Sequence, residues 1–172
     1  MNDLRVGISS CLLGNHVRYD GKHKLLKELE NIFPDLVELI PFCPEVATGL
    51  GIPRPPIQLS DSLTHPKACL KDNPGKCFTA QLREFAWKVA NEYELHGFIF
   101  KSRSPSCGLN SAPVSIDGQV QDQMVSGIFA AALLEHLPYL PAIDETFITS
   151  GNDLDQFLDL CHSYRQCGPA GF

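Results

Sequence analysis

Cysteines are the residues of this chain with the greatest capacity for unusual chemistry, because seven of them occur among 172 residues. An odd number of thiols cannot all be paired in disulfides, so some must be buried, bind metal or react. Three of them, Cys11, Cys43 and Cys107, each come at or shortly after the end of an apolar run. If those runs are neighbouring parallel strands, the three thiols meet at one edge of a sheet, where open α/β proteins bind ligands.

Three converging thiolates favour a soft metal. They suit tetrahedral zinc with one open position, and they equally suit three irons of a [4Fe–4S] cluster whose fourth iron is free. The spacing alone leaves both possibilities open. A buried free cysteine is also an ordinary small hydrophobic residue, so each of the three has a purely structural alternative.

The other four cysteines show weaker patterns. Cys69 and Cys77 flank a turn signal and are interpreted mainly as ordinary loop cysteines, with a redox or zinc-binding pair as the alternative. Cys161 lies on the apolar stripe of the last predicted helix, so we expect it in the core. Cys167 lies close to the end of the chain.

One carboxylate near the three thiols is a candidate for proton transfer. Glu45 follows Cys43 across a proline and is the nearest carboxylate in sequence to any of the three, so it is a candidate base or proton carrier. Its alternative role is that of a solvated loop acid or a partner at a helix N-terminus. Ser104 precedes a proline and has the ordinary interpretation of a turn residue. Gly108, directly after Cys107, permits close backbone approach.

Basic side chains gather on the same loops although the net charge of the chain is -6. They are Arg18, Lys22, Arg54, Lys101 and Arg103. Such a local reversal of sign favours thiolates and an anionic cluster, or an anionic or carbonyl-bearing substrate. The alternative is a set of scattered, solvated side chains.

The elements that must position these residues alternate between strand and helix. The sequence predicts strands over residues 5–9, 35–42 and 98–101, a weaker strand over 140–143, and helices over 24–33, 79–96, 122–137 and 153–164. This alternation indicates a single-domain (1–172) three-layer α/β/α fold with a mainly parallel, Rossmann-like sheet and a C-terminal helical tail over 150–172. Residues 43–76 hold six of the 13 prolines and are expected to form a functional or disordered loop.

Composition excludes several classes of protein. A net charge of -6 argues against binding to a nucleic acid duplex through its phosphates. The longest apolar run covers residues 128–134, against the ~20 residues that a membrane helix requires. The first residues carry no apolar signal region, so we expect a cytoplasmic protein.

Three motifs together resemble a known family. Residues 9–14 (SSCLLG) with 17–21 (VRYDG), residues 43–46 (CPEV) with 53–56 (PRPP), and residues 101–108 (KSRSPSCG) occur in the order found in the thiouracil desulfurases, a bacterial family formerly known only as a domain of unknown function. Residues 127–130 (GIFA) fit a later helix of that family. The resemblance extends over residues 5–145.

The resemblance implies a [4Fe–4S] cluster held by Cys11, Cys43 and Cys107, with one iron not ligated by protein. It implies that this iron binds the sulfur of a thiocarbonyl such as 2-thiouracil, and that Glu45 and Ser104 are catalytic. The expected reaction is non-redox and gives uracil and hydrosulfide. Substrate contacts are expected from nearby polar residues: Ser10, Arg18, Asp20, Arg54, Lys101 and Arg103.

Two other classes of function stay open at this point. One is a zinc-binding protein with three cysteine ligands, and the other is an iron–sulfur or thiol sensor without enzymatic activity. The expected partner is a small thiolated nucleobase or a related thioamide. The sequence specifies neither the physiological substrate nor the oligomeric state.

Overall fold

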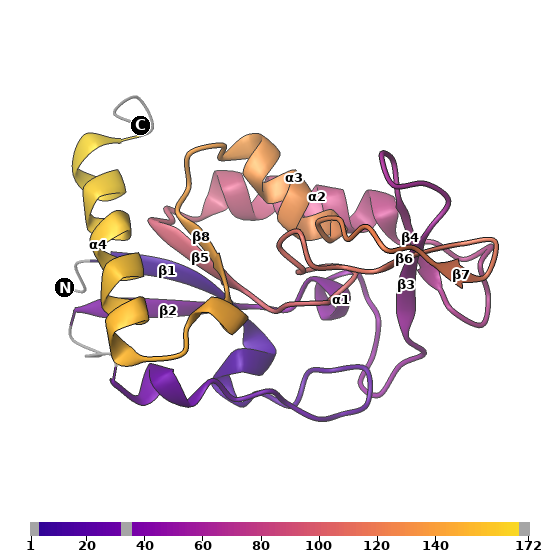
Figure 1. Ribbon diagram of the computed structural model, residues 1–172, viewed down its shortest axis with the longest axis horizontal. Coiled ribbons are helices and arrows are strands. Elements are labelled where there is room, and N and C mark those ends of the chain that lie inside the picture. Colours follow the sequence, from indigo (N-terminus) through magenta and orange to yellow (C-terminus); the bar gives the residue numbers. More distant parts are fainter. Residues whose placement is uncertain (1–3, 32–35, 169–172) are drawn as a thin grey trace.

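A four-stranded parallel sheet, sheet A, forms the centre of the computed structural model, which describes residues 4–31 and 36–168 (Figure 1). Its strand order is β2-β1-β5-β8. The strands are β1 (Leu4–Ser9), β2 (Val37–Phe42), β5 (Gly97–Phe100) and β8 (Ala142–Asp144). All three pairings are parallel, which confirms the predicted strands to within two residues at most ends.

Side chains on the two faces of sheet A pack against different helices. Leu4, Val6 and Ile8 of β1 are fully buried against α4 (Gly151–Cys167). Phe98 and Phe100 of β5 pack on the other face, with α2 (Thr79–Glu92) and α3 (Ile128–His136). Since successive side chains of a strand point to opposite faces, this alternation produces the predicted three-layer α/β/α arrangement.

A second sheet, sheet B, was not predicted. It has the order β4-β3-β6-β7 and mixed pairing, and it lies at the opposite end of the molecule from α4 (Figure 1). Its strands are β3 (Ile57–Ser60), β4 (Lys67–Leu70), β6 (Val114–Ile116) and β7 (Gln119–Val120). Strands of two to four residues are too short to show a clear alternation of apolar and polar residues, so the sequence shows them poorly.

The expectation of an unstructured loop over residues 43–76 is therefore wrong. This stretch contains α1 (Pro44–Ala47) as well as β3 and β4. Buried side chains from sheet B form their own core with the start of α2 and of α3, and these include Leu59, Leu82 and Ile128. The proline-rich segment is thereby packed against the rest of the molecule.

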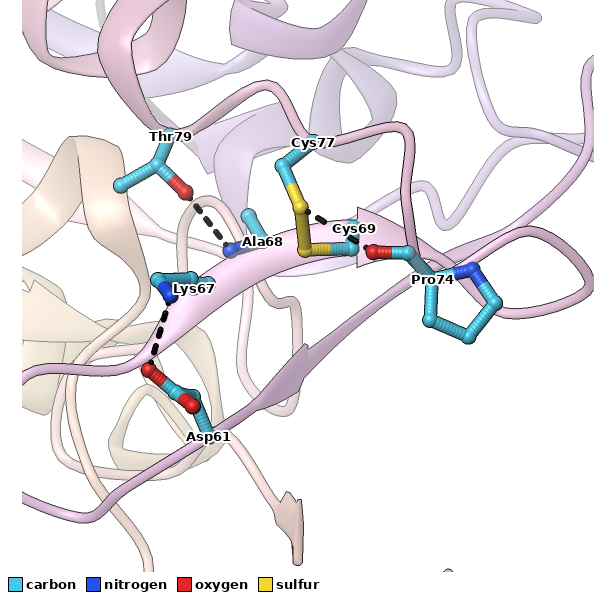
Figure 2. The surroundings of a disulfide bond; sticks show 7 residues. All are labelled: Asp61, Lys67, Ala68, Cys69, Pro74, Cys77 and Thr79. Carbon is cyan, nitrogen blue, oxygen red and sulfur yellow. Dashed lines mark hydrogen bonds and ion pairs between the residues drawn. A yellow bond between two sulfur atoms is a disulfide. The ribbon is translucent and has the colours of Figure 1, made fainter.

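Cys69 and Cys77 are joined by a disulfide, so their interpretation as ordinary loop cysteines is wrong (Figure 2). The two residues face each other across an antiparallel bridge between β4 and the segment that leads into α2. The hydroxyl of Thr79 accepts a hydrogen bond from the Ala68 amide at 2.9 Å, beside the disulfide (Figure 2). The start of α2 is thus tied to β4.

Three predicted helices are shorter than expected, and one of them is α2, which ends at Glu92 rather than at residue 96. In the described part of residues 24–33 only a 3₁₀ helix forms, Lys27–Asn31, while Ile32 and Phe33 lie outside the described residues. The amides of Lys24 and Leu26 donate instead to the carbonyls of Cys11 and Leu12. Because these bonds hold the chain alongside the segment after β1, the helix that the apolar spacing predicted does not start at residue 24.

The helix predicted over residues 122–137 begins only at Ile128. Val125 exchanges two backbone hydrogen bonds with Ala112, and this bridge keeps the preceding residues extended. The terminal helix is slightly longer than predicted, and Cys161 is fully buried on it, which confirms its core position. In the described part of the chain, no helix combines the length and apolar character that a bilayer crossing requires.

Candidate functional site

The three cysteines at the carboxyl edge of sheet A line one cavity of about 360 Å³. Cys11 lies in the 3₁₀ helix Ser10–Leu13, directly after β1, and Cys43 lies between β2 and α1. Cys107 lies on the loop that follows β5. Ser9 and Phe42 are register partners, so β1 and β2 end level with each other and deliver their cysteines to the same place. The cavity has the size of a small-molecule site.

Burial controls the protonation of these thiols. It raises the pKa of Cys11 to about 11, although the positive charges of Lys101 and Arg18 act in the opposite direction. Burial also raises the pKa of Cys43 and raises that of Cys107 well above the usual value, against a hydrogen bond from Ser9. A bound metal group would replace these protons, because metals bind the thiolate form.

The donor set suits an iron–sulfur group, because three cysteine thiols line one cavity. Within residues 4–31 and 36–168, however, no three Cys, His, Asp or Glu side chains lie close enough to bind one ion.

Glu45 is held by two buried partners. The Arg54 Nε donates to its Oε2 at 2.8 Å, and the Ser106 hydroxyl donates to its Oε1 at 3.1 Å. The Arg54 side chain is only 4% exposed and the Glu45 side chain 13%. Arg54 also donates to the Val17 carbonyl at 2.9 Å. Glu45 is therefore fixed as a mostly shielded carboxylate on the cavity wall and is not a solvated loop acid.

Ser104 forms the turn that presents Cys107. Its Oγ accepts hydrogen bonds from the amides of Ser106 at 3.2 Å and Cys107 at 3.0 Å. In the part of the chain that the structure describes, no protein group accepts a hydrogen bond from this hydroxyl. Because a hydroxyl that accepts twice still has one proton to donate, Ser104 can both shape the loop and donate into the cavity.

The basic side chains of the site differ in what they already bind. Lys101 Nζ contacts the carbonyl and hydroxyl oxygens of Ser102 and a carboxylate oxygen of Glu145. Its three N–H donors thus have protein acceptors, so Lys101 supplies positive charge rather than a free donor. Arg54 is likewise engaged with Glu45.

Of the remaining predicted substrate contacts, three line the cavity: Ser10, Arg18 and Arg103. Asp20 does not line it and instead lies 3.5 Å from the Nε of Arg18. That nitrogen is buried and makes no hydrogen bond with good geometry. Among the described residues, Arg18 Nε is thus a buried side-chain nitrogen on the cavity wall that lacks a hydrogen-bond partner.

Ser9, Ser106 and Lys24 were not singled out from the sequence but line the same cavity. Ser106 had a usable signal, because it lies two residues after Ser104 inside the same motif. No local pattern in the sequence indicates its hydrogen bond to Glu45, which lies 61 positions earlier in the chain. Ser9 accepts a hydrogen bond from the Lys101 amide at 3.0 Å and so links the ends of β1 and β5.

Two glycines allow the loop with Cys107 to pack closely. A Cβ on Gly108 would lie 2.9 Å from the Ser104 carbonyl oxygen. A Cβ on Gly127, just before α3, would lie 2.5 Å from the carbonyl carbon of Ser106. The amides of Gly127 and Ile128 donate to carbonyls of this loop at 2.8 and 3.0 Å, so α3 holds the loop from behind.

Gly127→Ala is expected to destabilise the protein by about 1–3 kcal/mol, because the clash is with backbone atoms that cannot rotate away. For a chain of this size the melting temperature falls by roughly 2–12 °C. Thermal unfolding followed by circular dichroism measures this. Gly151→Ala is the control, since its Cβ meets nothing within 4 Å. Equal melting temperatures for the two variants would contradict the close-packing argument.

Comparison with known proteins agrees with this geometry. The profile of the 2-thiouracil desulfurase family matches residues 6–145. The chain is 27% identical over 159 residues to the uncharacterized protein YbbK of Bacillus subtilis (strain 168), covering 88% of this chain and 98% of YbbK. Among solved structures, the [4Fe-4S]-dependent thiouracil desulfidase TudS is similar, with a TM-score of 0.67, 27% identity and coverage of 91% of this chain and 99% of that one. The chain belongs to the 2-thiouracil desulfurase family.

Proposed function

We propose that this protein is a [4Fe–4S]-dependent desulfurase that hydrolyses a thiocarbonyl such as 2-thiouracil, giving uracil and hydrosulfide, and that it acts in the cytoplasm. The observation that carries the proposal is the cavity that combines three cysteines with the mostly shielded carboxylate of Glu45. Family membership and the similarity to TudS support the same reaction class.

A cluster bound by Cys11, Cys43 and Cys107 would supply a Lewis-acidic iron for the thiocarbonyl sulfur. The protein must then take a proton from the attacking water and donate a proton to the substrate. Replacement of C=S by C=O with water leaves the oxidation state of carbon unchanged, so the overall reaction needs no electron donor.

Glu45 takes the proton of the attacking water. The hydrogen bonds from Arg54 and Ser106 to its two carboxylate oxygens support this role, because they orient the side chain. Ser104 donates its hydroxyl proton to a polar atom of the substrate. Its position is held by the two backbone amides that it accepts. The cations Arg18 and Arg103 line the wall on which a polar ring substituent would lie.

Anaerobic purification followed by iron, zinc and acid-labile sulfide analysis tests the cofactor. We expect about four irons and four sulfides per chain, and release of hydrosulfide together with uracil from 2-thiouracil. Zinc-loaded, colourless protein would overturn the cluster. A loaded cluster without hydrosulfide release from 2-thiouracil or another thioamide would overturn the enzymatic proposal and favour a sensor.

A further inference from the structure

Asp144 and Glu145, two consecutive acidic residues at the carboxyl end of β8, contact the two ends of the loop over residues 101–111. This loop carries Ser104 and Cys107. Asp144 is the register partner of Phe100 in the β5–β8 pair. Glu145, the residue after Asp144, therefore lies beside Lys101, the residue after Phe100. This position lets the two side chains form an ion pair. Neither carboxylate lines the cavity itself.

Glu145 holds the first end of the loop. One of its oxygens accepts from the Ser102 amide at 2.5 Å, and the other accepts from the Ser102 hydroxyl at 2.8 Å and from Lys101 Nζ. The Glu145 side chain is 11% exposed and that of Lys101 16%, so the ion pair is largely shielded from water. Hydrogen bonds to an ionised acceptor are among the stronger ones in proteins.

Asp144 holds the other end of the loop. It is 2% exposed, and its Oδ2 accepts from the Ser111 hydroxyl at 3.0 Å. The Ser111 oxygen in turn accepts from the Arg103 amide at 3.1 Å. Arg103 has a φ of 57°, in the left-handed region that non-glycine residues rarely adopt. Such a conformation persists where surrounding contacts enforce it. Here the contact to the Arg103 amide comes from Ser111, which is itself hydrogen-bonded to Asp144.

We propose that Asp144 and Glu145 are positioning residues that fix this loop, and with it Ser104 and Cys107, at the geometry the reaction requires. The inference rests on the proposed function. A shift of a reacting group by about 1 Å can cost up to 100-fold in rate. Loss of the Glu145 contacts should therefore act mainly on kcat.

Steady-state kinetics of the cluster-loaded Glu145→Ala variant test this. We expect kcat to fall about 10- to 100-fold, with KM changed less and with iron content retained. Glu145→Gln still offers an oxygen to the Ser102 amide and should recover much of that loss. Glu135→Ala is the matched control, because Glu135 forms an exposed ion pair with Arg83, 2.6 Å long, outside the cavity. A Glu145→Ala kcat equal to that of Glu135→Ala, or a loss that merely follows lost iron, would overturn the proposal.

Hydrogen exchange separates this inference from the proposed function. In Glu145→Ala the Ser102 amide loses its acceptor, so peptides over residues 101–111 should exchange faster, whereas Glu145→Gln should keep most of the protection. If the wild-type protein released no hydrosulfide, the proposed function would fail. Unchanged exchange in Glu145→Ala would overturn the positioning role, whatever the activity of the wild type.

Discussion

Glu45→Gln is expected to retain the iron–sulfur cluster and to lower kcat about 100- to 10,000-fold, the range that a general acid–base residue contributes. The glutamine oxygen can still accept from Arg54 Nε, and its amide can donate to the Ser106 hydroxyl. The change therefore removes the proton acceptor. The contacts at 2.8 and 3.1 Å can still form, but with a neutral amide in place of the carboxylate. Rates of hydrosulfide and uracil formation measure the loss.

The control for Glu45→Gln is Glu135→Gln, which neutralises an ion-paired glutamate at an exposed position. It should have wild-type kcat and iron content. Glu45→Ala tests the same role with a larger change, because it leaves the buried guanidinium of Arg54 without its carboxylate. A Glu45→Gln enzyme that keeps more than about a tenth of the wild-type kcat would show that the proton is carried by another group.

Cys43→Ala is expected to lose both the cluster and the activity. With one of three thiolates removed, two protein ligands remain for a group whose chelation depends on three. Alanine is preferred to serine, since a serine oxygen could still bind iron. The measurements are iron and acid-labile sulfide per chain and the visible absorbance of the anaerobically reconstituted protein.

Cys167→Ala is the matched control for Cys43→Ala, because Cys167 is a free, exposed thiol at the end of α4. It should bind the same amount of iron and sulfide as the wild type. Melting temperatures of the cluster-free proteins then show whether Cys43→Ala still folds. A Cys43→Ala protein that is active without a cluster would contradict the mechanism.

Local patterns predicted the parts of this protein that depend on residues close together in the chain. The apolar runs that became β1, β2 and β5 are short-range signals, and so are the positions of Cys11 and Cys43 at or just beyond strand ends. The rule that parallel strands end at one edge then brought the three cysteines together. Local patterns failed where tertiary hydrogen bonds intervened, as for Lys24 and Val125, whose backbone bonds replace predicted helix.

Sheet B belongs to the same class of failure. Its pairing joins β3, which precedes α2, with β6, which follows β5, and no local period in the sequence reports such a contact. The proline content of residues 43–76 predicted an irregular backbone. In the structure, apolar side chains of that stretch pack in a core with α2 and α3. Burial of those side chains, rather than local propensity, decided the structure there.

The sequence by itself determined membership of the 2-thiouracil desulfurase family, through three ordered motifs that contain Cys11, Cys43, Cys107, Glu45 and Ser104. Tertiary structure alone decided how these groups are held. It paired Arg54 with Glu45, which changes a predicted substrate contact into a partner of the proposed proton carrier. It also brought Asp144 and Glu145 to the loop of Ser104 and Cys107. The physical reason is that side-chain chemistry is a property of each residue, whereas the partner of a buried charge depends on which distant segments the fold packs together.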